Sequence, residues 1–252
     1  MIAETRPVIL FDWGETLVRI PGMVHTPEAH LACARSAFHA EIRPRFDAIG
    51  RPIDEARFMT CYEAAAREHI RRSGETLREH RFEERLQAAL AMAEAHGVIE
   101  PAHALAFASH LGERVLEGLT LERADVPDVL RALGERYRLG IVSNYPFGPV
   151  VSGSLERIGV ADVFSAVLVS GEVGWSKPHP EIFRHALAAM DADPARTLFV
   201  GDNPVADMQG AKRAGMQTAW YAPGRAHAKP AEADVHVEHL GELLPWCEAR
   251  LH

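Results

Sequence analysis

Two aspartates that lie far apart in the chain each follow a short apolar run. Asp12 comes directly after residues 8–11, and Asp202 follows residues 197–200 and Gly201. Open α/β sheets place their chemistry at the carboxyl ends of buried strands, so neighbouring runs would bring these carboxylates together. Carboxylates in proximity repel each other unless a cation lies between them. Since Mg²⁺ is usually bound by one or two carboxylates, water and substrate phosphate, the pattern predicts a magnesium site.

Two other segments supply groups that can hold a transferring phosphoryl group. Ser143 and Asn144 follow the apolar run 139–142, and Lys177 precedes Pro178 in a loop. Taken singly, Ser143 and Asn144 suit a turn or helix cap, and Lys177 suits a solvated side chain. Taken together, Ser143 can donate its hydroxyl to a phosphoryl oxygen while Lys177 supplies positive charge.

A further carboxylate, Asp207, follows Asp202 at the start of a predicted helix. Two roles suit this position. It can orient Lys177 or a metal-bound water, or it can interact favourably with the helix dipole.

The elements that must position these residues are predicted from hydrophobic periodicity. Continuous apolar runs without alternation favour a parallel sheet covered on both faces. They predict strands at 8–11, 139–142, 166–169, 197–200 and 218–221. Helical patterns are present at 126–137, 180–190, 205–214 and near 240–250, whereas 223–239 is predicted to be irregular surface. Strands that alternate with helices predict βαβ units with right-handed crossovers, and so a doubly wound α/β fold.

Residues 20–122 differ from the rest because they show no convincing strand. We predict helices at about 27–48, 53–72, 80–96 and 102–117, with breaks near 50–52, 73–74 and 97–101. These helices carry polar residues on every face, which hides their orientation. An all-helical block after the first strand predicts a second domain inserted into the core, in preference to helices packed on the sheet edge. The predicted domains are therefore a core of 1–19 and 123–252 and an insert of 20–122.

Composition narrows the class of protein. The chain has 252 residues, 47% hydrophobic and 25% charged, as is ordinary for a globular protein. Its formal net charge of -8 argues against general binding to nucleic acid or an anionic membrane. Three widely spaced cysteines form neither a metal site nor a disulfide framework, and the first residues lack a signal-peptide pattern. We expect a cytoplasmic protein whose oligomeric state the sequence does not indicate.

The order of these segments resembles the haloacid dehalogenase-like hydrolase superfamily over nearly the whole chain. The first motif is Phe11-Asp12-Trp13-Gly14-Glu15-Thr16-Leu17, the second Ser143-Asn144, the third Lys177-Pro178, and the fourth Gly201-Asp202 with Asp207. Each motif is short, but four in order at predicted strand ends or loops are specific. The resemblance implies a Rossmann-like core with a type-1 helical cap inserted after the first strand.

The resemblance also implies roles for individual residues. Asp12 would be the nucleophile that forms a covalent aspartyl-phosphate, and Mg²⁺ would bind Asp12, Asp202 and the backbone carbonyl of Gly14. Ser143 and Lys177 would hold the transferring group. Asn144 and Thr16 would contact the substrate, a small phosphorylated molecule. Asp207 would support these residues without contacting the substrate itself. Phosphoryl transfer itself needs little beyond positioning and charge neutralisation.

One position departs from the family's phosphatase pattern. Those enzymes carry a second aspartate two positions after the nucleophile, which acts as general acid and base; this chain has Gly14 there. A positioned acid–base group typically contributes about 10²–10⁴-fold to the rate. Glu15 is the candidate replacement, although the turn is expected to point it elsewhere.

Three interpretations follow. The first is a Mg²⁺-dependent phosphatase that is slow or suited to a good leaving group. The second is a 2-haloacid dehalogenase-like hydrolase, because halide leaves without a proton. That branch typically lacks the first acidic residue of the fourth motif, so Asp202 favours phosphate. The third is a catalytically impaired binding protein, against which Asp12, Lys177 and Asp202 argue.

Overall fold

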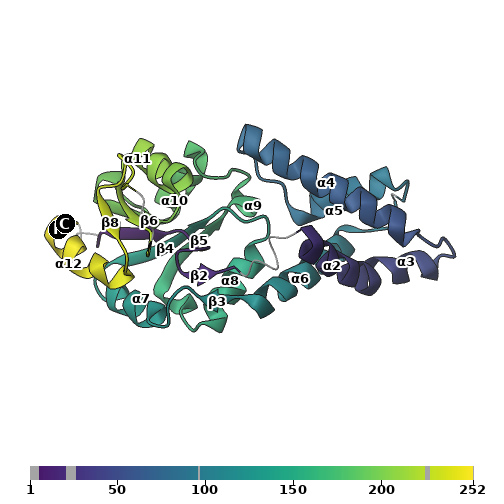
Figure 1. The fold of residues 1–252 in the computed structure, drawn as a ribbon, viewed down its shortest axis with the longest axis horizontal. Coiled ribbons are helices and arrows are strands. Elements are labelled where there is room, and N and C mark those ends of the chain that lie inside the picture. The colour runs from purple at the N-terminus through teal and green to yellow at the C-terminus, as the bar shows by residue number, and fades with distance from the viewer. Residues whose placement is uncertain (1–5, 21–26, 96, 225–227, 252) are drawn as a thin grey trace. The chain divides into compact units, whose positions relative to one another are not determined.

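The computed structural model describes residues 6–20, 27–95, 97–224 and 228–251 of the chain. It divides into two compact units (Figure 1). Unit 1 comprises Met1–Arg19 and Thr120–His252, and unit 2 comprises Ile20–Leu119. Among the described helices, none combines the length and the apolar character needed to cross a lipid bilayer.

Unit 1 is built on a six-stranded sheet of order β5-β4-β1-β6-β7-β8, in which all neighbouring strands run parallel. The strands are β1 (Val8–Phe11), β4 (Arg138–Ser143), β5 (Phe164–Val169), β6 (Thr197–Gly201), β7 (Gln217–Tyr221) and β8 (Val235–Val237). The five predicted strands and the α/β class are confirmed. β1 lies between β4 and β6, so the chain winds outward from the centre in both directions.

Helices cover both faces of this sheet. The helices of unit 1 are α7 (Val126–Gly134), α8 (Gly148–Arg157), α9 (Ser170–Val173), α10 (Pro180–Ala189), α11 (Gly210–Arg213) and α12 (Leu243–Arg250), with a π-helical turn η4 (Pro204–Gln209) before α11. Figure 1 shows α10 and α11 on one face and α7 and α8 on the other.

The core follows from strand alternation. Val8 and Leu10 pack with Phe199 of β6 and with Phe183 of α10 in one buried apolar layer. Ile9 and Phe11 point to the opposite face and are equally buried. β1 is therefore apolar along its whole length because both of its faces are covered.

Three local predictions were wrong. The segment 223–239 was predicted to be irregular, but Val235–Val237 pairs with β7 as β8. The break predicted at Ser73-Gly74 does not occur, because α4 (Glu55–Thr76) continues through it. The helix predicted over 205–214 divides into η4 and α11.

A short hairpin flanks the helical insert. β2 (Val18–Arg19) pairs antiparallel with β3 (Thr120–Leu121), and Arg19 forms a bidentate ion pair with Glu122 at 2.8 and 3.1 Å. Two-residue strands carry little periodicity, which is why the sequence did not predict them. The hairpin joins the segment leading into the insert to the segment leading out of it.

Unit 2 is helical in its described residues. Its elements are α2 (Pro27–Ala37), the π-helical turn η1 (Phe38–Ile42), α3 (Arg43–Ala48), α4, α5 (Phe82–Met92) and α6 (Pro101–Gly118). Phe38, Phe58 and Tyr62 form a stacked row, and Tyr62 meets Phe107 edge to face. These rings give the unit a core of its own.

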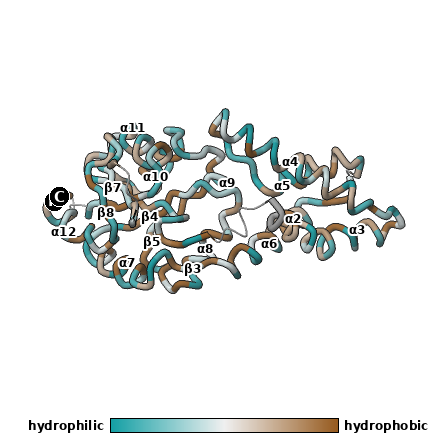
Figure 2. Tube along the Cα trace, in the orientation of Figure 1, coloured by the Kyte–Doolittle hydropathy of each residue, from teal (hydrophilic) through white to brown (hydrophobic). Residues whose placement is uncertain are grey.

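The amphipathic character of α4 corrects the expectation of helices that are polar on every face. Its buried residues recur at helical spacing, at Phe58, Met59, Tyr62, Ala65, Ala66 and His69. The colouring of the trace in Figure 2 alternates accordingly along α4. Charged residues between these positions concealed the stripe.

Val8 offers a test of the core assignment. Val8→Ala removes two methyl groups from the buried layer and should lower the free energy of unfolding of unit 1 by about 2 kcal/mol. Val205, 52% exposed at the start of η4, is a matched control. Val205→Ala should change the same quantity by less than ~0.5 kcal/mol. Urea denaturation followed by circular dichroism measures both, and equal shifts would contradict the assignment.

Candidate active site

Three of the predicted site residues lie at the carboxyl edge of the sheet. Asp12 follows β1, Ser143 ends β4, and Asp202 follows β6, while β1 pairs directly with both other strands. The backbone N–H of Asp12 donates to the carbonyl of Val200 at 2.8 Å, which extends the β1–β6 ladder as far as the aspartate. Strands 8–11 and 197–200 are neighbours, which is the condition for bringing Asp12 and Asp202 together.

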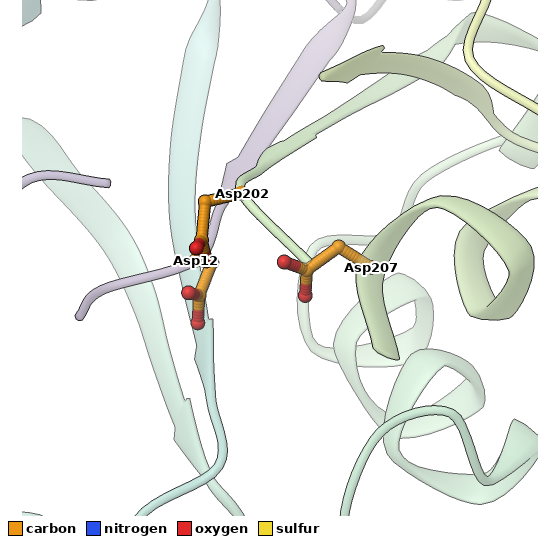
Figure 3. A group of neighbouring side chains, drawn as sticks. All are labelled: Asp12, Asp202 and Asp207. Atoms are coloured by element: carbon orange, nitrogen blue, oxygen red, sulfur yellow. The ribbon is translucent and has the colours of Figure 1, made fainter. Parts of the chain in front are cut away.

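Three carboxylates converge at this edge. Asp12, Asp202 and Asp207 each offer an oxygen within 4.8 Å of the others. Figure 3 shows Asp12 and Asp202 projecting from adjacent strand ends, with the carboxylate of Asp207 turned toward them from η4. Carboxylate oxygens at this spacing are a donor set that suits a hard divalent cation such as Mg²⁺.

Lys177 lies between two of these carboxylates. Its Nζ is 2.7 Å from Oδ1 of Asp12 and 2.7 Å from Oδ1 of Asp207. The exposed fraction of the side chain is 2% for Lys177, 13% for Asp12 and 1% for Asp207. A buried charge is costly unless it is paired, so each member of the cluster depends on the others.

Burial and charge shift the proton affinities of this cluster. Burial raises the pKa of Asp12; Lys177 opposes that shift, while the charges of Asp207 and Asp202 add to it. For Lys177, burial alone would lower the pKa, but Asp12 and Asp207 together raise it above its ordinary value. The lysine is therefore cationic at neutral pH, and the carboxylates favour a further positive charge.

Asn144 holds the backbone of Lys177 at two points. The Asn144 side chain donates Nδ2–H to the carbonyl of Lys177 at 2.9 Å and accepts the N–H of Lys177 on Oδ1 at 2.7 Å. The ammonium group lies 5.1 Å from the ring centroid of Phe199, within the range of a cation–π contact. In this structure Asn144 positions Lys177, and its contact with substrate stays a prediction.

Asp207 is fixed by its neighbours on η4. The N–H of Asn203 donates to Oδ2 of Asp207 at 2.9 Å, and the Asn203 side chain caps the turn by accepting the N–H groups of Val205 and Ala206. A Cβ at Gly201 would lie 2.3 Å from Oδ2 of Asp207. Glycine is required at 201 because the carboxylate occupies the space of a side chain.

Asp202 is held through its backbone. Trp220 of β7 is buried, and its indole Nε1–H donates to the carbonyl of Asp202 at 2.9 Å. Neither Trp220 nor Asn203 was predicted as a site residue. Asn203 had a detectable signal, because Asn followed by Pro204 is a helix start. Trp220 had none, since its contact depends on the pairing of β6 with β7.

The turn after Asp12 places the remaining predicted residues. The N–H of Glu15 donates to the carbonyl of Val18 at 2.7 Å, and Glu15 adopts a left-handed backbone with φ 57°. Thr16 is fully buried, and its hydroxyl has no hydrogen-bond partner among the described residues. Ser143 is 2% exposed. The catalytic role of Ser143 and the substrate contact of Thr16 stay predictions.

Glu15 interacts with the hairpin. The pKa of Arg19 is raised chiefly by Glu122, and the charge of Glu15 adds to that shift. The main influences on the pKa of Asp12 are burial, Lys177, Asp207 and Asp202. Nothing in this arrangement favours Glu15 as the acid/base, and that role stays a prediction.

Comparison with known proteins gives a family match. A family model described as haloacid dehalogenase-like hydrolase matches residues 7–215. This span contains all four motifs and the helical insert.

Individual relatives agree with this match, and a solved structure agrees with the fold. The chain is 29% identical to a ribulose-1,5-bisphosphate 5-phosphatase of Halopiger xanaduensis, over 93% of this chain and 96% of that protein. It is 44% identical to a phosphoserine phosphatase of Thermus thermophilus over 87 residues, which is 34% of this chain and 35% of that protein. Its fold resembles a 2-haloacid dehalogenase of Pseudomonas syringae pv. Tomato, with a TM-score of 0.67, 24% identity and coverage of 98% and 100%.

The contact between position 201 and Asp207 generates a prediction. Gly201→Ala forces the Asp207 carboxylate away from Lys177 and from the N–H of Asn203. Overpacking of this kind should lower the free energy of unfolding by about 1–3 kcal/mol. Gly74→Ala is the matched control, because a Cβ there meets nothing within 4 Å and alanine favours the helix by about 1 kcal/mol. Urea denaturation measures the free energy of unfolding of each variant. A Gly201→Ala variant as stable as the wild type would contradict this account.

Proposed function

The chain belongs to the haloacid dehalogenase-like hydrolase family, and from this premise we propose that it is a Mg²⁺-dependent phosphatase that forms an aspartyl-phosphate on Asp12. One observation carries the proposal, namely that Asp12, Asp202 and Asp207 lie close together while the buried Lys177 pairs with two of them, Asp12 and Asp207. The substrate is a small phosphorylated molecule. Phosphatase relatives support this choice, including one that aligns with almost the whole chain.

Asp12 has the position that a nucleophile requires. It lies at the end of the central strand, and 13% of its side chain is exposed, whereas Lys177 and Asp207 are almost completely buried. The ion pair with Lys177 orients the Asp12 carboxylate. Orientation and charge neutralisation supply most of the catalysis in phosphoryl transfer.

Charge balance supports a cation as cofactor. When Asp12, Asp202 and Asp207 are all ionised, Lys177 leaves two of the three negative charges unbalanced, which repels a phosphate. Asp12, Asp202 and the backbone carbonyl of Gly14 would hold Mg²⁺, which neutralises phosphoryl oxygens when bound. Asp207 serves the site by holding Lys177.

The remaining residues act around the phosphoryl group. Lys177 stays cationic because it is paired, so it can attract phosphoryl oxygens without donating its proton. Ser143 ends β4 beside Asp12, and we assign its hydroxyl as a donor to the same group. Asn144 fixes the loop that carries Lys177, and Thr16 is the further substrate contact that we propose.

Gly14 favours a second candidate function, halide release from a 2-haloacid. A halide departs without a proton, so that reaction does not need an acid at position 14. Asp202 favours a phosphorylated substrate over a haloacid. Its carboxylate suits a metal ligand, and a metal-independent dehalogenation has no need of one. Chloride release from 2-chloropropionate without metal would establish this alternative.

We also propose a cytoplasmic location, which agrees with the free state of Cys33, Cys61 and Cys247.

The first functional prediction concerns the nucleophile. The wild-type protein should hydrolyse p-nitrophenyl phosphate with Mg²⁺ and not with EDTA. Asp12→Asn should lower kcat by ~10³-fold or more, because loss of a nucleophile removes the covalent route. Asp128→Asn makes the same chemical change at a side chain that is 87% exposed and should have no effect. Hydrolysis that survives EDTA, or an active Asp12→Asn variant, would refute the proposal.

The second functional prediction concerns the metal. Asp202→Asn removes a charged metal ligand. Loss of a residue that only supports a metal ligand typically lowers metal affinity by about 10–100-fold. The Mg²⁺ concentration for half-maximal activity should therefore rise by at least that factor. Titration of activity with Mg²⁺ measures this concentration. An unchanged value would remove Asp202 from the ligand set.

A further inference from the structure

The departing group in phosphate ester hydrolysis needs a proton when it is an alkoxide. An alkoxide is far more basic than water at neutral pH, so an alkyl ester depends on a general acid within hydrogen-bond reach of the leaving oxygen. A phosphoric anhydride or an acyl phosphate differs, because its leaving group is a stable phosphate or carboxylate anion. The side chains around Asp12 therefore decide which class of substrate this site can process.

The charged side chains beside Asp12 are already committed. Lys177 binds Asp12 and Asp207 at 2.7 Å each and is 2% exposed. Asp207 forms an ion pair with Lys177 through Oδ1 and accepts the N–H of Asn203 on Oδ2. Asp202 is the carboxylate that we assign to the metal. None of these three is placed to give a proton to a leaving group.

Position 14 of the turn after Asp12 supplies no acid in their place. Gly14 has no side chain, although its backbone does not lie in the left-handed region, where a larger residue would be strained. Glu15 does lie in that region and donates its backbone N–H to the carbonyl of Val18 at 2.7 Å. The absence of an acid at position 14 is thus a property of the sequence and is not imposed by the backbone.

Resting on the phosphatase function proposed above, we propose that the substrates are phosphoric anhydrides or acyl phosphates, whose leaving groups depart as stable anions, in preference to alkyl phosphate esters. The juxtaposition that carries this inference is an intact Asp12–Lys177–Asp207 cluster beside a side-chain-free position 14.

The chemistry balances without an acid or a base from the protein. In the first step an oxygen of Asp12 forms a bond to phosphorus, the bond from phosphorus to the leaving oxygen breaks, and its electron pair departs on the phosphate or carboxylate anion. In the second step a water oxygen bonds to phosphorus and the electron pair of the broken bond returns to Asp12. Both protons of that water leave on the product, dihydrogen phosphate.

The test compares substrates of graded leaving-group pKa. With Mg²⁺, wild-type kcat/KM should fall steeply from acetyl phosphate and pyrophosphate through p-nitrophenyl phosphate to glycerol 3-phosphate. Gly14→Asp should raise the ratio of kcat/KM for glycerol 3-phosphate to kcat/KM for acetyl phosphate by ~10²–10⁴-fold, because only the alkoxide leaving group needs the added acid. Gly14→Asn is the matched control, because it has the same shape without a titratable proton, and it should leave that ratio as it is in the wild-type protein.

The outcomes separate the two proposals. If wild-type kcat/KM for glycerol 3-phosphate matches that for acetyl phosphate, the phosphatase function stands and the inference on substrate class is wrong. If no phosphate compound is hydrolysed with Mg²⁺, the phosphatase function itself fails, and the inference falls with it. The substrate series uses the native protein, so it decides the matter even if a variant at position 14 does not fold.

Discussion

The buried ion-pair cluster of Lys177 with Asp12 and Asp207 is the interaction on which the rest of the site depends. A lysine that is 2% exposed is tolerated because two carboxylates lie 2.7 Å from its Nζ. Those carboxylates are tolerated because the lysine, and beyond it a divalent cation, offsets their charge. Any element that displaces one member leaves an unpaired charge in a dry environment, so the surrounding structure must fix all three.

The fold fixes the three residues through a small number of contacts made by different strands and loops. Parallel pairing of β1 with β6 brings Asp12 beside Asp202. The two-point contact of Asn144 with the backbone of Lys177 joins the β4 loop to the Lys177 loop. Gly201 leaves room for the Asp207 carboxylate, and Trp220 holds the Asp202 carbonyl. The sheet thereby converts sequence segments that are far apart into one rigid constellation.

The sequence predicted what depends on residue type and periodicity. Continuous apolar runs located the strands around the site, and acidic residues at two strand ends located its carboxylates. It did not predict β8 or the hairpin of β2 with β3, because strands of two or three residues have no period. It also missed Trp220, whose role exists only once β7 lies beside β6. The contact of the Asn144 amide with the backbone of Lys177 was also missed, because residue type alone does not show it, and the predicted contact of Asn144 with substrate stays a prediction.

The central claim is that Asp12 carries the phosphoryl group during turnover. Acid quench of the native protein during turnover of acetyl phosphate with Mg²⁺, followed by borohydride reduction and peptide mass spectrometry, tests it most directly. The account predicts that reduction converts Asp12 to homoserine only when both acetyl phosphate and Mg²⁺ are present. Turnover without modification of Asp12, or modification of a different carboxylate, would contradict it.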